Sequence, residues 1–184
     1  MSGDSLSIPA HTEHYSVVLL KEAGGAFLLQ RRASGKGLLY AGRIGLFGGR
    51  REGDEMPEAT AVREIAEECG VALKPAKLTL LARLLAQDER GVLSLGHIYF
   101  SEDLEREAVR AALKFRSDEG KGVLLSPAGI GRRSAELTSI SLYALSAFAD
   151  FGKARAPARP RGLAMLWPAV GARVPGNAGK RRIS

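Results

Sequence analysis

The chain has 184 residues, of which 45% are hydrophobic and 26% are charged, which predicts one domain with a sizeable core. No apolar run approaches the length needed to span a membrane, so a membrane partner is not expected. Cys69 is the single cysteine and excludes an internal disulfide. The N-terminus lacks the basic start and apolar stretch of a signal peptide, so we expect a cytoplasmic protein.

The formal net charge of +7 is unevenly distributed along the chain. Residues 1–150 hold 19 basic and 20 acidic side chains, whereas from residue 151 onward there are eight basic and no acidic ones. Prolines and glycines accompany that basic run. We therefore predict an N-terminal extension at 1–13, a folded domain at 14–151 and a flexible basic extension at 152–184.

Two functions remain open for the basic extension. It could contact nucleic acid or an anionic surface through charge, or it could serve only as a poorly ordered, solubilising terminus. A short apolar stretch at 163–167 could dock on the domain or on a partner. The oligomeric state is not determined by the sequence, and a homodimer is compatible with it.

Hydrophobic periodicity and turn residues predict a mixed order of strands and helices within the domain. In chain order these are strands at 15–21, 26–31 and 44–47, a helix at 57–69, strands at 78–86 and 92–100, a helix at 102–113, a strand at 122–125 and a helix at 137–151.

The helix at 57–69 is the best defined of these elements. Pro57 suits a first helical position and Gly70 suits a C-terminal stop. A period of 3.6 residues places three carboxylates on one side, and an apolar side opposite them must face a core. The carboxylates belong to Glu64, Glu67 and Glu68, and the apolar side consists of Ala59, Val62, Ile65 and Cys69.

Like charges at this spacing destabilise a helix by roughly 0.2–0.5 kcal/mol per pair. A cation among the glutamates would offset that cost, and hard oxygen ligands favour Mg²⁺, with Mn²⁺ as a substitute. The alternative is a solvated charged face, in which Arg63 and Glu67 form an ordinary surface ion pair. That alternative does not explain the positions of Gly48, Gly49 and Glu55 before the helix.

Residues 49–71 as a whole carry a resemblance to a known family. A glycine, a glutamate, an arginine–glutamate pair, an apolar residue, two glutamates, a glycine and an apolar residue follow one another at fixed spacing. These residues are Gly49, Glu55, Arg63, Glu64, Ile65, Glu67, Glu68, Gly70 and Val71. The segment resembles the Nudix box, the signature of hydrolases that cleave nucleoside diphosphates linked to another group.

The resemblance implies a fold and a set of residue roles. The expected fold is α/β, a Nudix-like α/β/α sandwich with a mixed β-sheet between helices. Glu64, Glu67 and Glu68 would ligate the divalent ions, and a backbone carbonyl of Gly48 or Gly49 would complete the coordination. Arg63 would orient a catalytic glutamate, and Glu55 would support the loop or the outer coordination shell. One glutamate, which the sequence does not identify, would accept the proton of the attacking water.

A further carboxylate is a catalytic candidate outside the box. Several relatives place a catalytic or metal-binding glutamate on a later loop, and Glu119, before a glycine, resembles it. The alternative is a solvated turn, which aspartate and glycine favour on their own.

The substrate is less constrained by the sequence. Arg31, Arg43 and Arg50 are candidates for binding phosphates, and Phe47 is a candidate for contacting a base. Phe47 also stands where many relatives have a proline, which leaves the shape of the pocket open.

Within the resembled family, residues 28–32 match the upstream signature of coenzyme A-cleaving members only in part, and Leu85 and Ala86 stand where ADP-ribose-cleaving members have a proline. The resemblance therefore implies a magnesium-dependent nucleoside triphosphate pyrophosphohydrolase, including one that acts on oxidised nucleotides. Two alternatives remain. One is a pyrophosphohydrolase of RNA 5′ ends that uses the basic extension, and the other is a non-catalytic, Nudix-like nucleotide-binding regulatory module.

Overall fold

The computed structural model describes residues 12–35, 40–87, 92–154 and 161–166. Its strands are β1 (Glu13–Glu22), β2 (Phe27–Arg32), β3 (Ile44–Gly45), β4 (Phe47–Arg50), β5 (Thr79–Gln87), β6 (Leu93–Leu104), β7 (Arg116–Ser117), β8 (Gly120–Leu125) and β9 (Arg161–Leu166). Its helices are α1 (Pro57–Cys69), α2 (Arg106–Lys114), α3 (Pro127–Arg132) and α4 (Ser139–Ala154), with 3-10 turns at Pro75–Lys77 and Ser134–Glu136.

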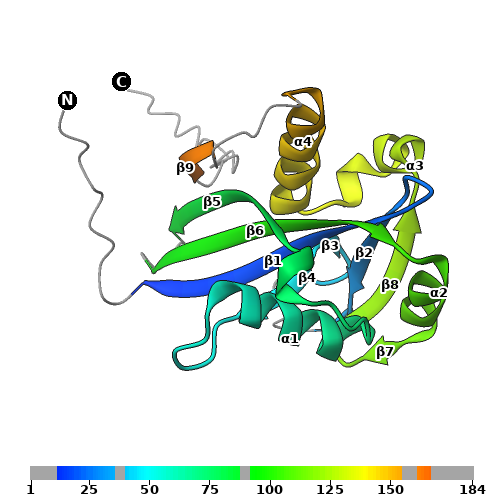
Figure 1. The fold of residues 1–184 in the computed structure, drawn as a ribbon, viewed down its shortest axis with the longest axis horizontal. Coiled ribbons are helices and arrows are strands. Elements are labelled where there is room, and N and C mark those ends of the chain that lie inside the picture. The colour runs from blue at the N-terminus through cyan, green and yellow to red at the C-terminus, as the bar shows by residue number, and fades with distance from the viewer. Residues whose placement is uncertain (1–11, 36–39, 88–91, 155–160, 167–184) are drawn as a thin grey trace, which may run out of the picture.

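The strands form one mixed sheet with the order β7-β8-β2-β1-β6-β5-β9. β3 lies beside β2, and β4 lies beside β1. The pairs β1–β6 and β5–β9 run parallel, whereas the other pairs are antiparallel. Figure 1 shows α4 and α1 on opposite sides of the sheet. The expected α/β/α sandwich is therefore confirmed.

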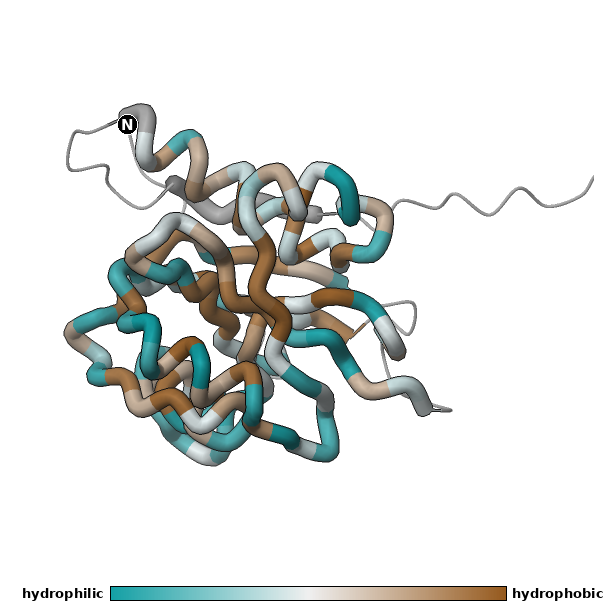
Figure 2. The backbone as a smooth tube through the Cα atoms, turned by 90° about the vertical axis from the view of Figure 1, so that its right-hand side faces the viewer, coloured by the Kyte–Doolittle hydropathy of each residue, from teal (hydrophilic) through white to brown (hydrophobic). Residues whose placement is uncertain are grey.

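Two apolar clusters, one on each face of the sheet, form the core. Along β1, Val17 and Leu19 belong to the cluster that packs against α4, whereas Val18 and Leu20 belong to the cluster that packs against α1. This alternation follows from the two-residue period of a strand. Figure 2 shows the hydrophobic strands in the middle of the molecule. The apolar side chains of α1 are buried against one face of these strands, and this burial stabilises the position of the helix.

Several elements differ from the sequence predictions. β6 continues to Leu104, whose side chain is buried in the cluster facing α1, so α2 begins at Arg106 and not near residue 102. The predicted strand at 44–47 is divided into β3 and β4, which pair with different neighbours. α3 was not predicted, although Ser126 caps it by accepting a hydrogen bond from the Gly129 N–H.

Part of the predicted basic extension joins the sheet. Residues 161–166 form β9, which runs parallel to β5 and covers its outer edge, within the stretch expected to be flexible. α4 also continues to Ala154, past the predicted domain boundary at 151. The remaining parts of both extensions, 1–11, 155–160 and 167–184, lie outside the described residues. Within the described residues, every helix is too short or too polar to cross a membrane.

Candidate metal centre and active site

The site begins at two consecutive glycines on β4. Gly48 has a φ of 135°, and a Cβ atom there would lie 2.1 Å from the backbone oxygen of Ser16 on β1. A Cβ atom on Gly49 would lie 2.5–2.6 Å from the three carboxylate atoms of Glu64. Glycine is therefore required at the first position for the pairing of β4 with β1, and at the second for the approach of a carboxylate.

Glu55 organises the loop between β4 and α1. Its carboxylate accepts hydrogen bonds from the Glu52 N–H at 3.2 Å and from the Thr60 hydroxyl at 3.0 Å. Arg63 donates to both of its oxygens, from Nε at 2.9 Å and from Nη2 at 3.1 Å. This two-point contact is the main reason that the pKa of Glu55 is lowered to about 2. Glu55 thus holds the guanidinium in one orientation.

Arg63 connects the loop to the glutamates of α1. Its Nη1 donates to Glu64 Oε1 at 2.9 Å and to Glu67 Oε2 at 3.1 Å. Its Nη2 also donates to the backbone oxygen of Arg50 at 3.0 Å. One side chain therefore ties β4, the loop and α1 together and orients two of the predicted ligands.

The three glutamates of α1 differ in burial. Glu64 and Glu68 are 9% and 3% exposed, whereas the side chain of Glu67 is 59% exposed. The predicted apolar side is also partly wrong, because Ala59 is exposed and Ala61 is buried in its place. The buried face of the helix is therefore rotated relative to the pattern, and it includes the two carboxylates of Glu64 and Glu68.

Burial perturbs both inner carboxylates. Burial raises the pKa of Glu64, while the neighbouring Arg63 acts in the opposite direction. Burial is also the main reason that the pKa of Glu68 is raised to about 8. Glu68 is held by two donors, the Gly48 N–H at 2.7 Å and Gln30 Nε2 at 2.8 Å.

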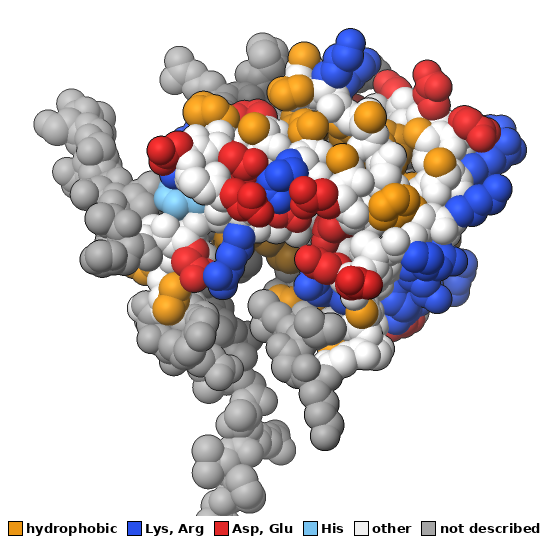
Figure 3. Space-filling view, turned by 90° about the horizontal axis from the view of Figure 1, so that it is seen from below, with side chains coloured by type: hydrophobic (Ala, Val, Ile, Leu, Met, Phe, Trp, Pro, Cys, Tyr) orange, Lys and Arg blue, Asp and Glu red, His pale blue; other side chains and the backbone are white. Residues whose placement is uncertain are grey.

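Glu119 comes to this cluster from the turn between β7 and β8. Its charge raises the pKa of both Glu64 and Glu68, and Arg32 Nη2 lies 3.7 Å from its Oε2. Its backbone oxygen accepts a hydrogen bond from the Ala33 N–H at 2.7 Å. Figure 3 shows acidic side chains gathered around basic ones on this face of the molecule. The four glutamates proposed from the sequence thus lie in one region.

The donor chemistry of this region fits a hard divalent cation, because carboxylate oxygens supply it. Across residues 12–35, 40–87, 92–154 and 161–166, however, no three histidine, cysteine, aspartate or glutamate side chains are placed so that they could hold a metal ion together. On α1, Arg63 Nη1 donates a hydrogen bond to both Glu64 and Glu67.

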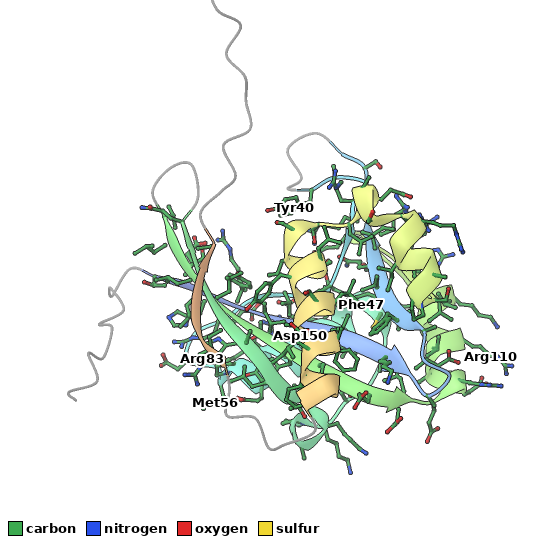
Figure 4. The ribbon with its side chains drawn as sticks, turned by 90° about the horizontal axis from the view of Figure 1, so that it is seen from above. Tyr40, Phe47, Met56, Arg83, Arg110 and Asp150 are labelled. Carbon is green, nitrogen blue, oxygen red and sulfur yellow. The ribbon has the colours of Figure 1, made fainter. Side chains whose placement is uncertain are left out.

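The four predicted substrate contacts do not gather at the cluster. Phe47 has no exposed surface and packs in the core facing α1, so its predicted contact with a base is not compatible with this structure (Figure 4). Arg31 donates to the Gly42 backbone oxygen and pairs with Glu136. The other two are Arg43, which donates to the Leu137 backbone oxygen, and Arg50, which is 71% exposed and pairs with Glu13.

The sequence analysis missed Gln30 as a residue of the site, and Arg32, a further arginine whose sequence position suggests phosphate binding, contacts it instead. Gln30 is fully buried on β2 and contacts Glu68, and Arg32 contacts Gln30 Oε1 at 3.3 Å. The available signal was a glutamine within an apolar strand run, at a position that shares a face with Leu28.

Comparison with known proteins identifies the family of the chain. The model of the NUDIX domain matches residues 10–129, which is more than half of the chain. The fold and the acidic site on α1 thus define a hydrolase of the Nudix class. The chain belongs to the Nudix hydrolase family, whose members act on nucleoside diphosphate-linked substrates.

Solved structures share the fold at low sequence identity. A MutT protein from Methanosarcina mazei has a TM-score of 0.60 and 17% identity, and the match covers 80% of this chain and 99% of that one. A NUDIX hydrolase from Nitrosomonas europaea has a TM-score of 0.58 and 14% identity, with 76% and 90% covered. A bifunctional NMN adenylyltransferase/ADP ribose pyrophosphatase from Francisella tularensis, complexed with AMP and a Mn ion, has a TM-score of 0.55 and 15% identity, with 80% and 43% covered.

Proposed function

We propose that this protein is a divalent-cation-dependent pyrophosphohydrolase of nucleoside triphosphates, including oxidised nucleotides. The observation that carries the proposal is the meeting of Glu64, Glu67 and Glu68 on α1 with Glu119 from a turn that is distant in sequence. A module that only binds nucleotides does not require four carboxylates in one region. Two of them, Glu64 and Glu68, are buried although burial raises their pKa values and so disfavours their charged forms.

Mg²⁺ is the proposed cation, with Mn²⁺ as a substitute. Mg²⁺ usually keeps several waters and is bound by one or two carboxylates together with substrate phosphates, so a closed protein cage is not required. Glu64 and Glu68 would hold it, and the exposed Glu67 would join them by turning away from Arg63. When bound, the cation would neutralise pyrophosphate charge and make a water molecule more acidic.

The residues of the chain itself have positioning roles in this proposal. Glu55 fixes Arg63, and Arg63 orients Glu64 against Gly49, where the absence of a Cβ atom leaves room for the carboxylate. Glu119 brings a further negative charge to the same region. One of these glutamates accepts the proton of the water that attacks phosphorus, and the nucleoside monophosphate and pyrophosphate leave as products.

The choice of nucleoside triphosphates rests on the sequence. The proline typical of ADP-ribose-cleaving relatives is absent from the segment after the box, where this chain has Leu85 and Ala86. The segment from residue 28 to 32 matches the upstream signature of coenzyme A-cleaving relatives only in part. A cytoplasmic location and a contact between the basic extension and nucleic acid stay expectations of the sequence.

The test is hydrolysis of a nucleotide panel with Mg²⁺, beside a Glu67→Gln, Glu68→Gln double variant. The panel contains triphosphates, oxidised triphosphates, ADP-ribose, sugar nucleotides, dinucleoside polyphosphates and RNA with a 5′ triphosphate. Glu107→Gln is the matched control, because Glu107 is an exposed carboxylate on α2. We expect release of pyrophosphate from triphosphates by the wild type and by the control, and loss of turnover in the double variant.

Other outcomes would replace the proposal. Turnover of RNA alone would favour the 5′-end hydrolase, and turnover of ADP-ribose or a sugar nucleotide alone would move the substrate class. No turnover of any substrate by folded protein that binds Mg²⁺ would favour a regulatory nucleotide-binding module.

A further inference from the structure

Gln30 is a polar side chain buried in an apolar part of the sheet. It has no exposed surface and lies on β2 two residues after Leu28, which belongs to the cluster facing α1. A buried amide is costly unless it is hydrogen-bonded. Both ends of this amide have partners: Nε2 donates to Glu68 Oε1 at 2.8 Å, and Oε1 accepts from Arg32 Nη1 at 3.3 Å. The orientation of the amide is therefore fixed.

The contact fixes Glu68 as well. The Gly48 N–H holds one carboxylate oxygen of Glu68 at 2.7 Å, and Gln30 holds the other. Each carboxylate oxygen has two lone pairs, so both oxygens can still accept a further partner. Because glutamine is neutral, it orients the carboxylate without placing a positive charge beside it. A lysine or arginine at this position would add a positive charge that repels a cation.

Arg32 extends the same chain of contacts to a second carboxylate. It donates to Gln30 through Nη1, and its Nη2 lies 3.7 Å from Glu119 Oε2. One continuous path thus joins Glu68 on α1, Gln30 and Arg32 on β2, and Glu119 in the turn between β7 and β8. Both ends of this path are glutamates of the acidic cluster.

We propose that Gln30 is a positioning residue, whose amide orients Glu68 and, through Arg32, Glu119 within the acidic cluster that would bind a divalent cation. This inference rests on the proposed function, because it assigns a role to Gln30 in the same site. Gln30 itself touches neither the substrate nor the reacting atoms in this role. Partners of this kind typically change metal affinity or activity by about 10–100-fold when they are lost.

The experiment measures the binding of Mn²⁺ alone to the full chain, from the electron paramagnetic resonance signal of free Mn²⁺. Gln30→Met keeps the length of the side chain and cannot donate to Glu68. We expect it to weaken Mn²⁺ binding by about 10–100-fold and to lower kcat by a similar factor at limiting Mn²⁺. Raising the Mn²⁺ concentration should restore part of the lost kcat.

Ser141→Ala is the matched control for loss of a buried polar group. Ser141 has no exposed surface and is hydrogen-bonded to Thr138 and to the Ile44 backbone oxygen, on the α4 side of the sheet. We expect this variant to lower the unfolding midpoint without changing the Mn²⁺ affinity. Should Gln30→Met fail to fold, Gln30→Asn serves instead, because it keeps the amide but is too short to reach Glu68.

The outcomes separate this inference from the proposed function. A folded Gln30 variant that binds Mn²⁺ within twofold of the wild type would overturn the role of Gln30 and leave the function standing. A wild type that binds no Mn²⁺ and hydrolyses no nucleotide would overturn the proposed function, and the role of Gln30 with it.

Discussion

The substitution Gly49→Ala should disturb the position of the Glu64 carboxylate and leave the stability of the fold nearly unchanged. A new Cβ atom would lie 2.5–2.6 Å from the Glu64 carboxylate, whereas ordinary van der Waals contact begins at 3.4 Å. The carboxylate can move away by this difference of about 1 Å, because it is the end of a flexible side chain. The backbone of Gly49 is not in the left-handed region, so alanine itself adds no backbone strain there.

The expected cost is therefore functional. A displacement of about 1 Å in a catalytic site can lower the rate by about 100-fold. The free energy of unfolding should change by no more than about 1 kcal/mol, because reduced freedom of the unfolded chain offsets part of the contact. The assay pairs steady-state hydrolysis of the best nucleotide of the panel with urea unfolding of the same preparation.

Gly131→Ala is the matched control for this experiment. A Cβ atom on Gly131, in α3, would meet nothing within 4 Å. The control should keep full activity and gain up to about 1 kcal/mol of stability. Wild-type activity and wild-type Mn²⁺ affinity in Gly49→Ala would refute the reasoning, since they would mean that Glu64 has no fixed place against this glycine.

Three further predictions concern the same fold. Gly48→Ala should destabilise the protein by about 3 kcal/mol in urea unfolding, because its Cβ atom would meet the rigid backbone of Ser16 at a positive φ. Arg63→Lys should lower turnover by about 10–100-fold although it retains the charge, because lysine cannot make the two-point contact with Glu55. The control Arg110→Lys, on the exposed side of α2 (Figure 4), should have no effect on turnover. The pKa of Glu136 is lowered to about 2 by two arginine neighbours, so its contribution to stability is present above pH 4.5 and is lost as the pH falls toward 2.

Each of these predictions has a contradicting result. Wild-type stability in Gly48→Ala would mean that the β1–β4 pairing adjusts at little cost. Full activity in Arg63→Lys would mean that charge alone orients Glu64. For Glu136, the difference in unfolding midpoint between the wild type and Glu136→Gln should shrink from pH 5 to pH 2, and a constant difference would rule out the ion pairs as its cause.

The sequence by itself determined the parts of the site that are local in the chain. The helix at 57–69, its proline start and its glycine stop are found at the predicted residues, because the fixed φ of proline, the left-handed conformation of glycine and helical periodicity act over a few residues. The spacing of the box likewise identified the family and the glutamates of α1, since one turn of helix brings them together.

Only the tertiary structure decided which groups surround those glutamates. The contacts of Glu68 with Gln30 and of Arg32 with Glu119 join segments that the sheet order brings side by side, and no local pattern encodes that order. The same holds for the burial of Phe47 and for the pairing of β9 with β5. Sequence periodicity specifies which face of an element is apolar, whereas the packing of distant elements specifies what that face meets.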